Sequence, residues 1–297
     1  MPAERDAHEE TRMSMTMRSL LFVPGDRPER FEKAATSGAD AIIIDLEDSV
    51  GLANKEKARD AVAAYGAGLR SAALFVRVNP LTSEHFARDL RAVRESKPDG
   101  VVLPKCEGAE SVELCADQFK GSGCSEIPIL PIATETPAAI FKLGTFERVR
   151  RLICGLTWGA EDLPAAIGAM TSRERDGRYT APYEVVRSLA LFAAHAAGVQ
   201  AIETVYPGMR DLDGLKSYAE RGRRDGFTGM MAIHPDQVPI INAAFTPGEE
   251  EVARAEAIVA AFEAEPGIGV IELDGRMLDF PHLKSARSVL AAATRRR

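Results

Sequence analysis

The sequence predicts an α/β protein whose main part is a (β/α)8 TIM barrel with a C-terminal extension. Eight short apolar runs recur along the chain, and amphipathic segments separate them. The interiors of these runs are almost continuously apolar, which is typical of parallel strands that are covered on both faces. Strands that alternate with helices indicate a parallel sheet, and eight such units can close into a barrel.

The predicted strands follow one another at intervals that leave room for a helix between each pair. They are expected at residues 19–25, 41–48, 73–80, 100–105, 128–136, 151–162, 200–206 and 229–235. Between them, residues 54–70, 85–96 and 212–226 show apolar side chains at helical spacing. An open, doubly wound sheet is the alternative, but no GxGxxG glycine pattern follows the first strand.

The chain of 297 residues is expected to divide into three parts. Residues 1–17 are polar and predict a flexible N-terminal tail, and residues 18–247 predict the barrel. Residues 248–297 predict a helix, a short hairpin and a last helix, which a barrel does not require. We expect this C-terminal extension to cover another surface of the chain or to pack on a neighbouring subunit.

Composition narrows the class of protein. The chain is 45% hydrophobic and 27% charged, with a net charge of −7, which argues against binding to nucleic acid or to an anionic membrane. No apolar run approaches the ~20 residues that cross a bilayer, and the polar N-terminal residues lack the apolar core of a signal peptide. The four cysteines form no CxxC pair and predict reduced thiols. We therefore expect a cytoplasmic protein.

Polar residues gather where the predicted strands end. In barrel enzymes the active site lies at the C-terminal ends of the strands. Any single residue there could instead cap a helix or form an ion pair, as Asp162, Thr134 or Thr136 could at a helix start. A ring of them at nearly every strand predicts a functional site. Its members are Pro24, Gly25, Asp45, Glu47, Asp48, Arg77, Asn79, Lys105, Glu135, Asp162, Tyr206 and His234.

Glu135 and Asp162 follow neighbouring strands, so their carboxylates are expected to converge. Two unpaired carboxylates repel and raise each other's pKa. A shared proton, an intervening Arg or Lys, or a divalent cation would relieve this repulsion. Two carboxylates completed by substrate oxygens and water suit Mg²⁺, which takes about six hard oxygen ligands. No His or Cys cluster indicates zinc, and we expect the two acids to hold magnesium.

Arg77 lies two strands before Glu135. A guanidinium beside a metal suits a substrate that carries a carboxylate or develops an oxyanion. It could also pair with Asp45 or Glu47, and the two roles are compatible. Lys105 could form a Schiff base, but nearby acids would keep its amine charged. His234 could line the site or hydrogen-bond a loop.

An ordered set of motifs extends this interpretation. It consists of RSLLFVPGDRPERFEKA, GADAIIIDLEDSV, LFVRVNP, VVLPK, ATETPAAI, GAEDL, AIHPDQV and GRMLDFP. Over residues 18–294 the chain resembles the citrate lyase β-subunit-like group of the HpcH/HpaI aldolase superfamily, which includes malyl-CoA and citramalyl-CoA lyases. The resemblance implies a TIM barrel, Mg²⁺, a β-hydroxyacyl-CoA or oxo-acid substrate, and a homo-trimer or hexamer.

The resemblance also assigns roles to matching positions. Glu135 and Asp162 match the metal ligands, and Arg77 matches the arginine that contacts the oxo-acid or enolate oxygen. Asp279 of RMLDFP matches an acid/base aspartate that reaches in from an adjacent subunit, and Glu47 of DLED matches an acid of the motif. We expect further residues to line the substrate site, namely Pro24, Gly25, Asp45, Lys105, Gly159, Ala160 and Glu161.

Two positions depart from the family pattern. Met230 stands where the family usually has lysine, and Glu203 stands where it has aspartate, so the CoA contacts and the exact substrate stay open. The hypothesis is an Mg²⁺-dependent carbon–carbon lyase that gives an oxo acid and an acyl-CoA from malyl-, citramalyl- or citryl-CoA by a Claisen-type route. The alternatives are a (3S)-malyl-CoA-type thioesterase, a CoA-independent oxo-acid aldolase, and a citrate lyase β subunit that needs an acyl carrier partner.

Overall fold

The structure of the protein is a computed structural model that describes residues 17–68, 70–121, 124, 126–265 and 267–294. It divides into two compact units between Asn242 and Ala243. The predicted N-terminal tail lies outside the described residues except for Met17. Met17 is 1% exposed and belongs to the core of the first unit, so at this residue the predicted tail boundary is wrong.

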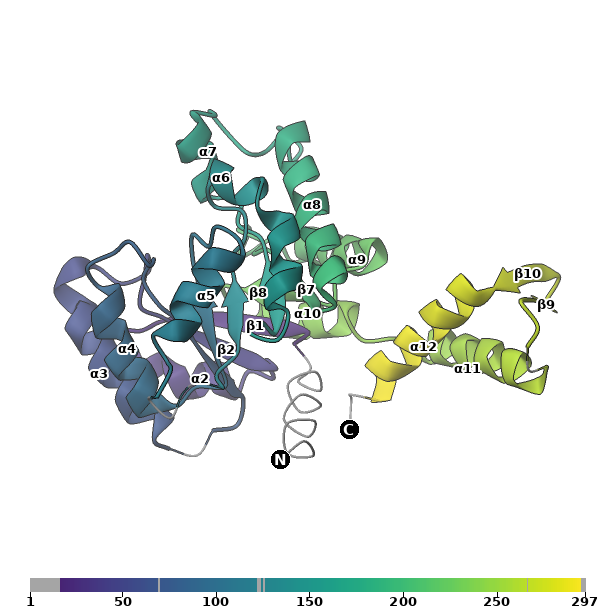
Figure 1. The fold of residues 1–297 in the computed structure, drawn as a ribbon, viewed down its shortest axis with the longest axis horizontal. Coiled ribbons are helices and arrows are strands. Elements are labelled where there is room, and N and C mark those ends of the chain that lie inside the picture. Colours follow the sequence, from purple (N-terminus) through teal and green to yellow (C-terminus); the bar gives the residue numbers. More distant parts are fainter. Residues whose placement is uncertain (1–16, 69, 122–123, 125, 266, 295–297) are drawn as a thin grey trace. The chain divides into compact units, whose positions relative to one another are not determined.

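The first unit contains eight parallel strands, as predicted. Each is shorter than the apolar run that predicts it, because the last residues of most runs leave the sheet and enter loops (Figure 1). The strands are β1 (Ser19–Pro24), β2 (Ala41–Asp45), β3 (Ala73–Arg77), β4 (Gly100–Leu103), β5 (Ile129–Pro131), β6 (Gly155–Thr157), β7 (Gln200–Glu203) and β8 (Gly229–Ala232).

The sheet closes on itself. β1 pairs in parallel with both β2 and β8, so the first strand lies inside the sheet and not at its edge. Parallel bridges Ile129–Ile153 and Ile132–Thr157 join the remaining two strands, β5 and β6. This closure confirms the barrel and excludes the open, doubly wound sheet.

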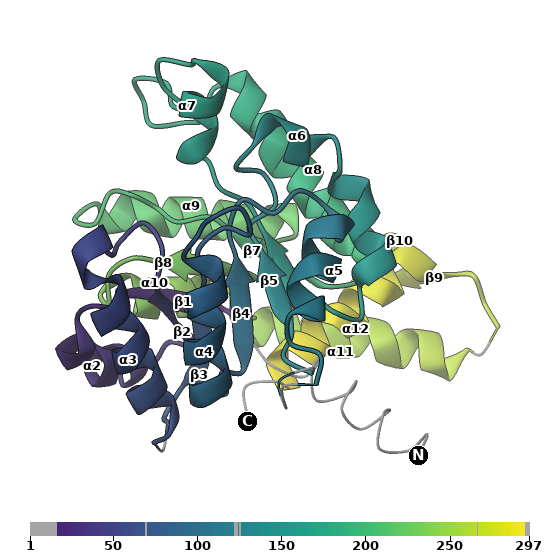
Figure 2. The ribbon, with the colours of Figure 1, turned by 60° about the vertical axis from the view of Figure 1, so that its left-hand side comes forward.

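Helices surround the strands, and α3 and α4 lie side by side outside the sheet (Figure 2). The helices are α2 (Phe31–Ala35), α3 (Lys55–Gly66), α4 (Phe86–Ser96), α5 (Ala109–Asp117), α6 (Pro137–Ile140), α7 (Asp162–Ile167), α8 (Ala181–Ala197), α9 (Leu212–Asp225) and α10 (Gln237–Ala244). Short 3₁₀ turns are η1 (Pro28–Arg30), η2 (Leu52–Asn54) and η3 (Leu143–Val149). No helix among the described residues is long and apolar enough to cross a bilayer.

The barrel interior is filled by alternate residues of the strands. Side chains two residues apart point to the same side of a strand, so Ala41 and Ile43 of β2 and Ala73 and Phe75 of β3 all face the interior. The interior cluster comprises Met17, Leu20, Ala41, Ile43, Phe75, Val102, Leu130, Ile132, Ile202 and Met231. This packed interior leaves the strand ends as the place for polar chemistry.

The second unit has the predicted order of helix, hairpin and helix. It consists of α11 (Glu249–Ala264), β9 (Val270–Leu273), β10 (Arg276–Asp279) and α12 (Phe280–Thr294). Asp274 and Gly275 both have positive φ, which is the conformation of the Asp-Gly turns that favour a two-residue hairpin. Its core consists of Ala255, Ile258, Phe262, Ile271, Leu278, Leu283 and Ala286.

Candidate active site

The predicted ring of polar residues lies at one end of the barrel. Asp45 and Arg77 are the last residues of β2 and β3, Lys105 comes two residues after β4, and Asp162 opens α7 after β6. Because the strands are parallel, their C-terminal ends share one edge of the barrel. The helices α6 and α7, which follow β5 and β6, mark this end (Figure 2).

Arg77 and Asp45 form a buried, two-pronged ion pair. Nε of Arg77 is 2.7 Å from Oδ1 of Asp45, and Nη2 is 2.7 Å from Oδ2. The main-chain N–H groups of Glu47 and Ser49 also donate to this carboxylate. Burial acts to raise the pKa of Asp45, but the guanidinium and these N–H groups hold it below its usual value. Both oxygens of Asp45 are engaged, so its contacts orient Arg77.

Glu47 connects Arg77 with Lys105. It is 3% exposed, and Lys105 Nζ donates to its Oε1 over 2.8 Å. Arg77 Nη1 lies 3.1 Å from Oε2, but that buried oxygen accepts no hydrogen bond in the described part of the chain. Burial raises the pKa of Glu47, and the two cations offset the shift only in part.

Lys105 contacts two acids through different groups. Its side chain pairs with Glu47, and its main-chain N–H donates to Oε2 of Glu135 over 2.5 Å. The residue has φ of +49°, which is the left-handed region that residues with a Cβ rarely adopt. Burial acts to lower the pKa of Lys105, but its acidic neighbours raise it, so the amine stays charged and is a poor Schiff-base former.

Glu135 is a desolvated acid. It is 5% exposed, and burial raises its pKa to about 8. The negative charges of Glu47 and Asp162 contribute to this rise in pKa, whereas the N–H of Lys105 and the charge of Arg77 oppose it. Asp162 therefore lies within electrostatic reach of Glu135. Asp162 is the first helical residue of α7, where it makes no cap, since the N-cap is Glu161 without a side-chain cap bond. The helix-cap alternative for Asp162 is therefore wrong.

The loops that carry these two acids are bonded to each other. The main-chain N–H of Gly159 donates to Oγ1 of Thr134 over 3.0 Å, and this hydroxyl donates to the carbonyl oxygen of Gly159. A Cβ on Gly159 would lie 2.8 Å from Cγ of Glu135, so only glycine leaves room for the acid. Thr136, by contrast, is the N-cap of α6, as the capping alternative predicts.

The other predicted site residues have varied surroundings. Gly25 follows β1 and donates to the carbonyl oxygen of Asp45, and a Cβ there would lie 2.6 Å from that oxygen. Ala160 is fully buried, whereas Glu161 is exposed. His234 accepts the main-chain N–H of Asp236, which corresponds to the loop-binding interpretation. Tyr206 donates to Asp211.

Sequence reasoning missed a buried network beneath the ring. Lys55 Nζ donates to the carbonyl oxygens of Leu46 (2.6 Å) and Glu47 (2.8 Å) and to Oδ1 of Asn79 (2.9 Å). Asn79 in turn donates to Asp89, which also pairs with Arg59. The sequence contains a signal for this network, because residues 55 and 59 of α3 share the inward face of the helix with Ala58 and Val62. Two cations on a buried helix face indicate buried acceptors.

The acids fit a divalent cation. Glu47 has an orphaned buried oxygen, and Glu135 is buried beside two further negative charges. A divalent cation would compensate the repulsion among these carboxylates. No group of three or more His, Cys, Asp and Glu side chains is placed to hold a metal by itself in the described ranges. Two carboxylates would need water and substrate oxygens to complete the coordination of Mg²⁺.

Asp279 lies in the second unit, at the end of β10. Its side chain is half exposed, and its Oδ1 is 2.5 Å from Nδ1 of His282. Three apolar side chains near it are exposed, those of Val270, Met277 and Phe280. Val270 is the cross-strand partner of Asp279.

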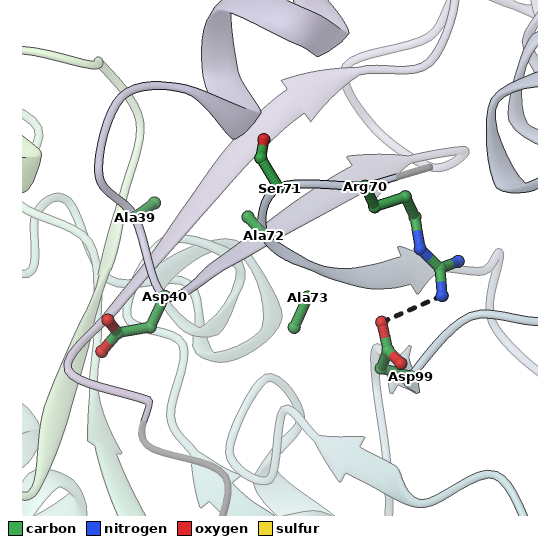
Figure 3. A pocket seen from close by; sticks show the side chains of 7 residues that line it. All are labelled: Ala39, Asp40, Arg70, Ser71, Ala72, Ala73 and Asp99. Carbon is green, nitrogen blue, oxygen red and sulfur yellow. Dashed lines mark ion pairs between the residues drawn. The ribbon is translucent and has the colours of Figure 1, made fainter. Parts of the chain in front are cut away.

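A pocket of about 530 Å³ lies at the other end of the barrel. Its lining residues directly precede β2, β3 and β4 or begin β3, so they belong to the N-terminal edge of the sheet (Figure 3). Arg70 pairs with Asp99 over 3.4 Å, and Asp40 pairs with Arg18 over 2.7 Å. The charges of this pocket are thus already compensated, and it takes no part in the acid ring.

Comparison with known proteins places the chain in a family. Residues 18–235 match the family model described as HpcH/HpaI aldolase/citrate lyase. The chain is 35% identical over 285 residues to a (3S)-malyl-CoA thioesterase of Cereibacter sphaeroides, covering 93% of this chain and 94% of the relative. It is 31% identical over 295 residues to the mitochondrial citramalyl-CoA lyase of Homo sapiens, covering 93% and 85%.

A solved structure agrees with these relatives. The protein CitE from Mycobacterium tuberculosis, in complex with magnesium, acetoacetate and coenzyme A, superposes with a TM-score of 0.80 and 33% identity, over 95% of this chain and 99% of that one. The closed barrel, the acids at its C-terminal end and the matched length lead to one conclusion: the chain belongs to the HpcH/HpaI aldolase/citrate lyase family.

Proposed function

We propose that the protein is a magnesium-dependent carbon–carbon lyase. Its substrate is a small β-hydroxyacyl-CoA of the malyl-, citramalyl- or citryl-CoA type, which it cleaves to an oxo acid and an acyl-CoA by a Claisen-type route. The observation that carries this proposal is the desolvated Glu135, whose pKa is raised to about 8 beside Asp162 and Glu47, with Arg77 fixed next to them. The CoA lyase among the relatives and the magnesium and coenzyme A of CitE support it.

Glu135 and Asp162 would hold the magnesium ion. When bound, the ion polarises the carboxylate and the adjacent hydroxyl or keto oxygen of the small acid. The chain prepares this site by three means. Gly159 leaves room for Glu135, Thr134 ties the two acid-bearing loops together, and the N–H of Lys105 fixes one carboxylate oxygen.

Arg77 would bind the oxo-acid end of the substrate. Its guanidinium is oriented by Asp45, and its Nη1 faces Glu47. A preorganised cation stabilises charge that develops in the transition state without needing to move. We assign Glu47 the role of holding Arg77 and Lys105 in place, because its two oxygens face their two cations.

Asp279 would transfer the proton at the acyl carbon, in the active site of a neighbouring subunit. The exposed apolar side chains of Val270, Met277 and Phe280 support burial of this surface in an oligomer. We propose a homo-trimer or hexamer. Cys106, Cys115 and Cys124 are buried free thiols, which supports a reducing compartment, and we propose the cytoplasm.

Hydrolysis of the thioester is the second candidate function. The relative from Cereibacter sphaeroides, a (3S)-malyl-CoA thioesterase, is about as similar to the chain as the lyase is. The two reactions differ in whether water captures the acyl group.

One assay separates the candidates. The protein is incubated with Mg²⁺ and malyl-, citramalyl- or citryl-CoA, and free thiol and oxo acid are followed separately. Oxo acid with acyl-CoA identifies the lyase, and free thiol with intact hydroxy acid identifies the thioesterase. Cleavage of the free hydroxy acid identifies an aldolase. Turnover only after addition of an acyl carrier protein identifies a citrate lyase β subunit and contradicts the proposal.

A further inference from the structure

A second titratable side chain lies against Asp279. Nδ1 of His282 is 2.5 Å from Oδ1 of Asp279 and 3.2 Å from the main-chain nitrogen of the same residue. Asp279 ends β10, and His282 lies in the first turn of α12. The two side chains are 50% and 53% exposed, so the pair is on the surface of the second unit.

These contacts require a proton between the ring and the carboxyl group. A carboxylate oxygen only accepts hydrogen bonds, and Nδ1 without a proton also only accepts them. Two acceptors at 2.5 Å repel each other, whereas a shared proton makes such a short contact favourable. With the proton on Nδ1, the ring donates to Oδ1 of Asp279 and cannot accept the main-chain N–H; with the proton on Oδ1, Nδ1 accepts from both groups. In either case the pair holds one proton in common.

We propose that His282 is a positioning residue for Asp279, which orients the carboxyl group and shares the proton that Asp279 transfers. The inference rests on the proposed function, in which Asp279 is the acid/base. In the cleavage direction, the O–H bond of the Asp279 carboxyl breaks as a C–H bond forms at the acyl carbon. The substrate hydroxyl releases its proton to water as the carbon–carbon bond breaks, and a proton from water then restores the pair, so no net proton is consumed.

The same contacts also resemble a helix cap. In a capping box, the side chain at the third helical position accepts the main-chain N–H of the N-cap residue, as Nδ1 of His282 does for Asp279 when it carries no proton. Glutamine commonly fills this position, and its amide oxygen accepts the same N–H. A glutamine amide neither takes up nor gives a proton as an imidazole ring does. His282→Gln therefore keeps the cap and removes the proton sharing.

The test compares His282→Gln with the wild-type full chain, loaded with Mg²⁺ and assayed with malyl-CoA and citramalyl-CoA. We expect kcat to fall roughly 10- to 100-fold, which is less than the ~10²–10⁴-fold that general acid–base catalysis contributes as a whole. KM is expected to stay within about twofold, because the pair acts on the proton transfer and not on substrate binding. Lys284→Gln, exposed on the same helix, is the matched control with wild-type kcat.

A second measurement follows the proton directly. Exchange of the methyl hydrogens of acetyl-CoA in D₂O, read by NMR, reports proton transfer at the acyl carbon without carbon–carbon cleavage. It should slow in His282→Gln by about the same factor as kcat. Thermal unfolding is measured for each variant, and His282→Asn provides the same comparison if the glutamine variant does not fold.

The outcomes are distinguishable. Wild-type kcat and exchange in His282→Gln, together with an inactive Asp279→Asn, would reduce His282 to a helix cap and overturn this inference alone. A fully active Asp279→Asn would overturn the proposed role of Asp279 and, with it, the role of His282.

Discussion

The main-chain N–H of Lys105 lies 2.5 Å from Oε2 of Glu135 and joins the turn after β4 to the acid that follows β5. Lys105 makes this contact with φ of +49°. A left-handed residue with a Cβ is unfavourable by itself and persists only where the surrounding structure holds it. Two hydrogen bonds hold Lys105 in this conformation. Its Nζ donates to Glu47, and its main-chain N–H donates to Glu135.

The left-handed turn can be tested by stability. Lys105→Gly and Lys105→Ala both lose the ion pair with Glu47, but only alanine keeps the steric cost of positive φ. We expect Lys105→Gly to be more stable than Lys105→Ala by about 1 kcal/mol. Urea unfolding of the metal-free proteins measures the difference. A more stable alanine variant would mean that the turn is not left-handed in solution.

Magnesium binding should depend on pH. The raised pKa of Glu135, about 8 against 4.5 for the ordinary group, means that a proton must leave before the carboxylate can bind a metal. We expect Mg²⁺ affinity, measured by calorimetry, to rise with pH up to about 8 and then level off. Equal affinity at pH 6 and pH 8 would contradict the assignment, and Glu135→Gln should bind weakly at both.

The same shift affects the stability of the metal-free protein. The folded-state pKa of Glu135 lies above the unfolded value of about 4.5, so its contribution to stability is fully present below that value. The contribution is lost as the pH rises through about 8. We expect the unfolding temperature to fall across this window and the fall to be smaller in Glu135→Gln.

Gly159→Ala should displace Glu135 while leaving the barrel folded. The added Cβ would lie 2.8 Å from Cγ of Glu135 and 3.2 Å from Cγ2 of Ile132. We expect Mg²⁺ affinity to fall by about tenfold or more, because a metal ligand that moves loses its preorganised geometry. Gly144→Ala is the control, since a Cβ there meets nothing within 4 Å. Unchanged affinity in Gly159→Ala would show that Glu135 does not need this space.

Lys55→Met should weaken both stability and activity. It removes one buried donor from the carbonyl oxygens of Leu46 and Glu47, which keep Nδ2 of Asn79 and the N–H of Val50 as donors. Oδ1 of Asn79 loses its Lys55 donor as well, and the expected cost is about 1–3 kcal/mol. Because these carbonyls belong to the turn that carries Glu47, kcat should fall as well. Lys57→Met, exposed on the same helix, should change neither quantity. Denaturant unfolding and steady-state kinetics measure the two effects. Wild-type stability together with wild-type kcat in Lys55→Met would show that this network does not support the site.

Arg77→Lys keeps the positive charge and loses the planar fork that binds Asp45. We expect kcat/KM to fall by ~10²–10³, the usual effect of losing one preorganised group. Arg77→Ala is a poorer test, since it also leaves Asp45 buried without its cation, and removal of one partner of a buried pair costs about 3–5 kcal/mol. Near-normal kcat/KM in a folded Arg77→Lys would show that the charge alone is sufficient.

Much of the fold could be predicted because burial leaves a local pattern. Continuous apolar runs predict the eight strands, and helical spacing predicts α3, α4 and α9. Parallel strands then bring their ends together whatever the loops do, so polar residues such as Arg77 and Lys105 could be assigned to one end of the barrel. The hairpin at Asp274 and Gly275 follows from the turn chemistry of that pair.

The sequence by itself therefore determined the architecture and the kind of residues at the site, through periodicities that span a few residues. Only the tertiary structure decided which partner each residue has. Asp45 engages Arg77 across 32 residues, and Lys105 reaches Glu47 across 58. Such contacts depend on strand register and on the conformation of single turns, as at Lys105. Because hydrogen bonds and ion pairs act over a few ångströms in space and not along the chain, one sequence carries no periodic signal for them.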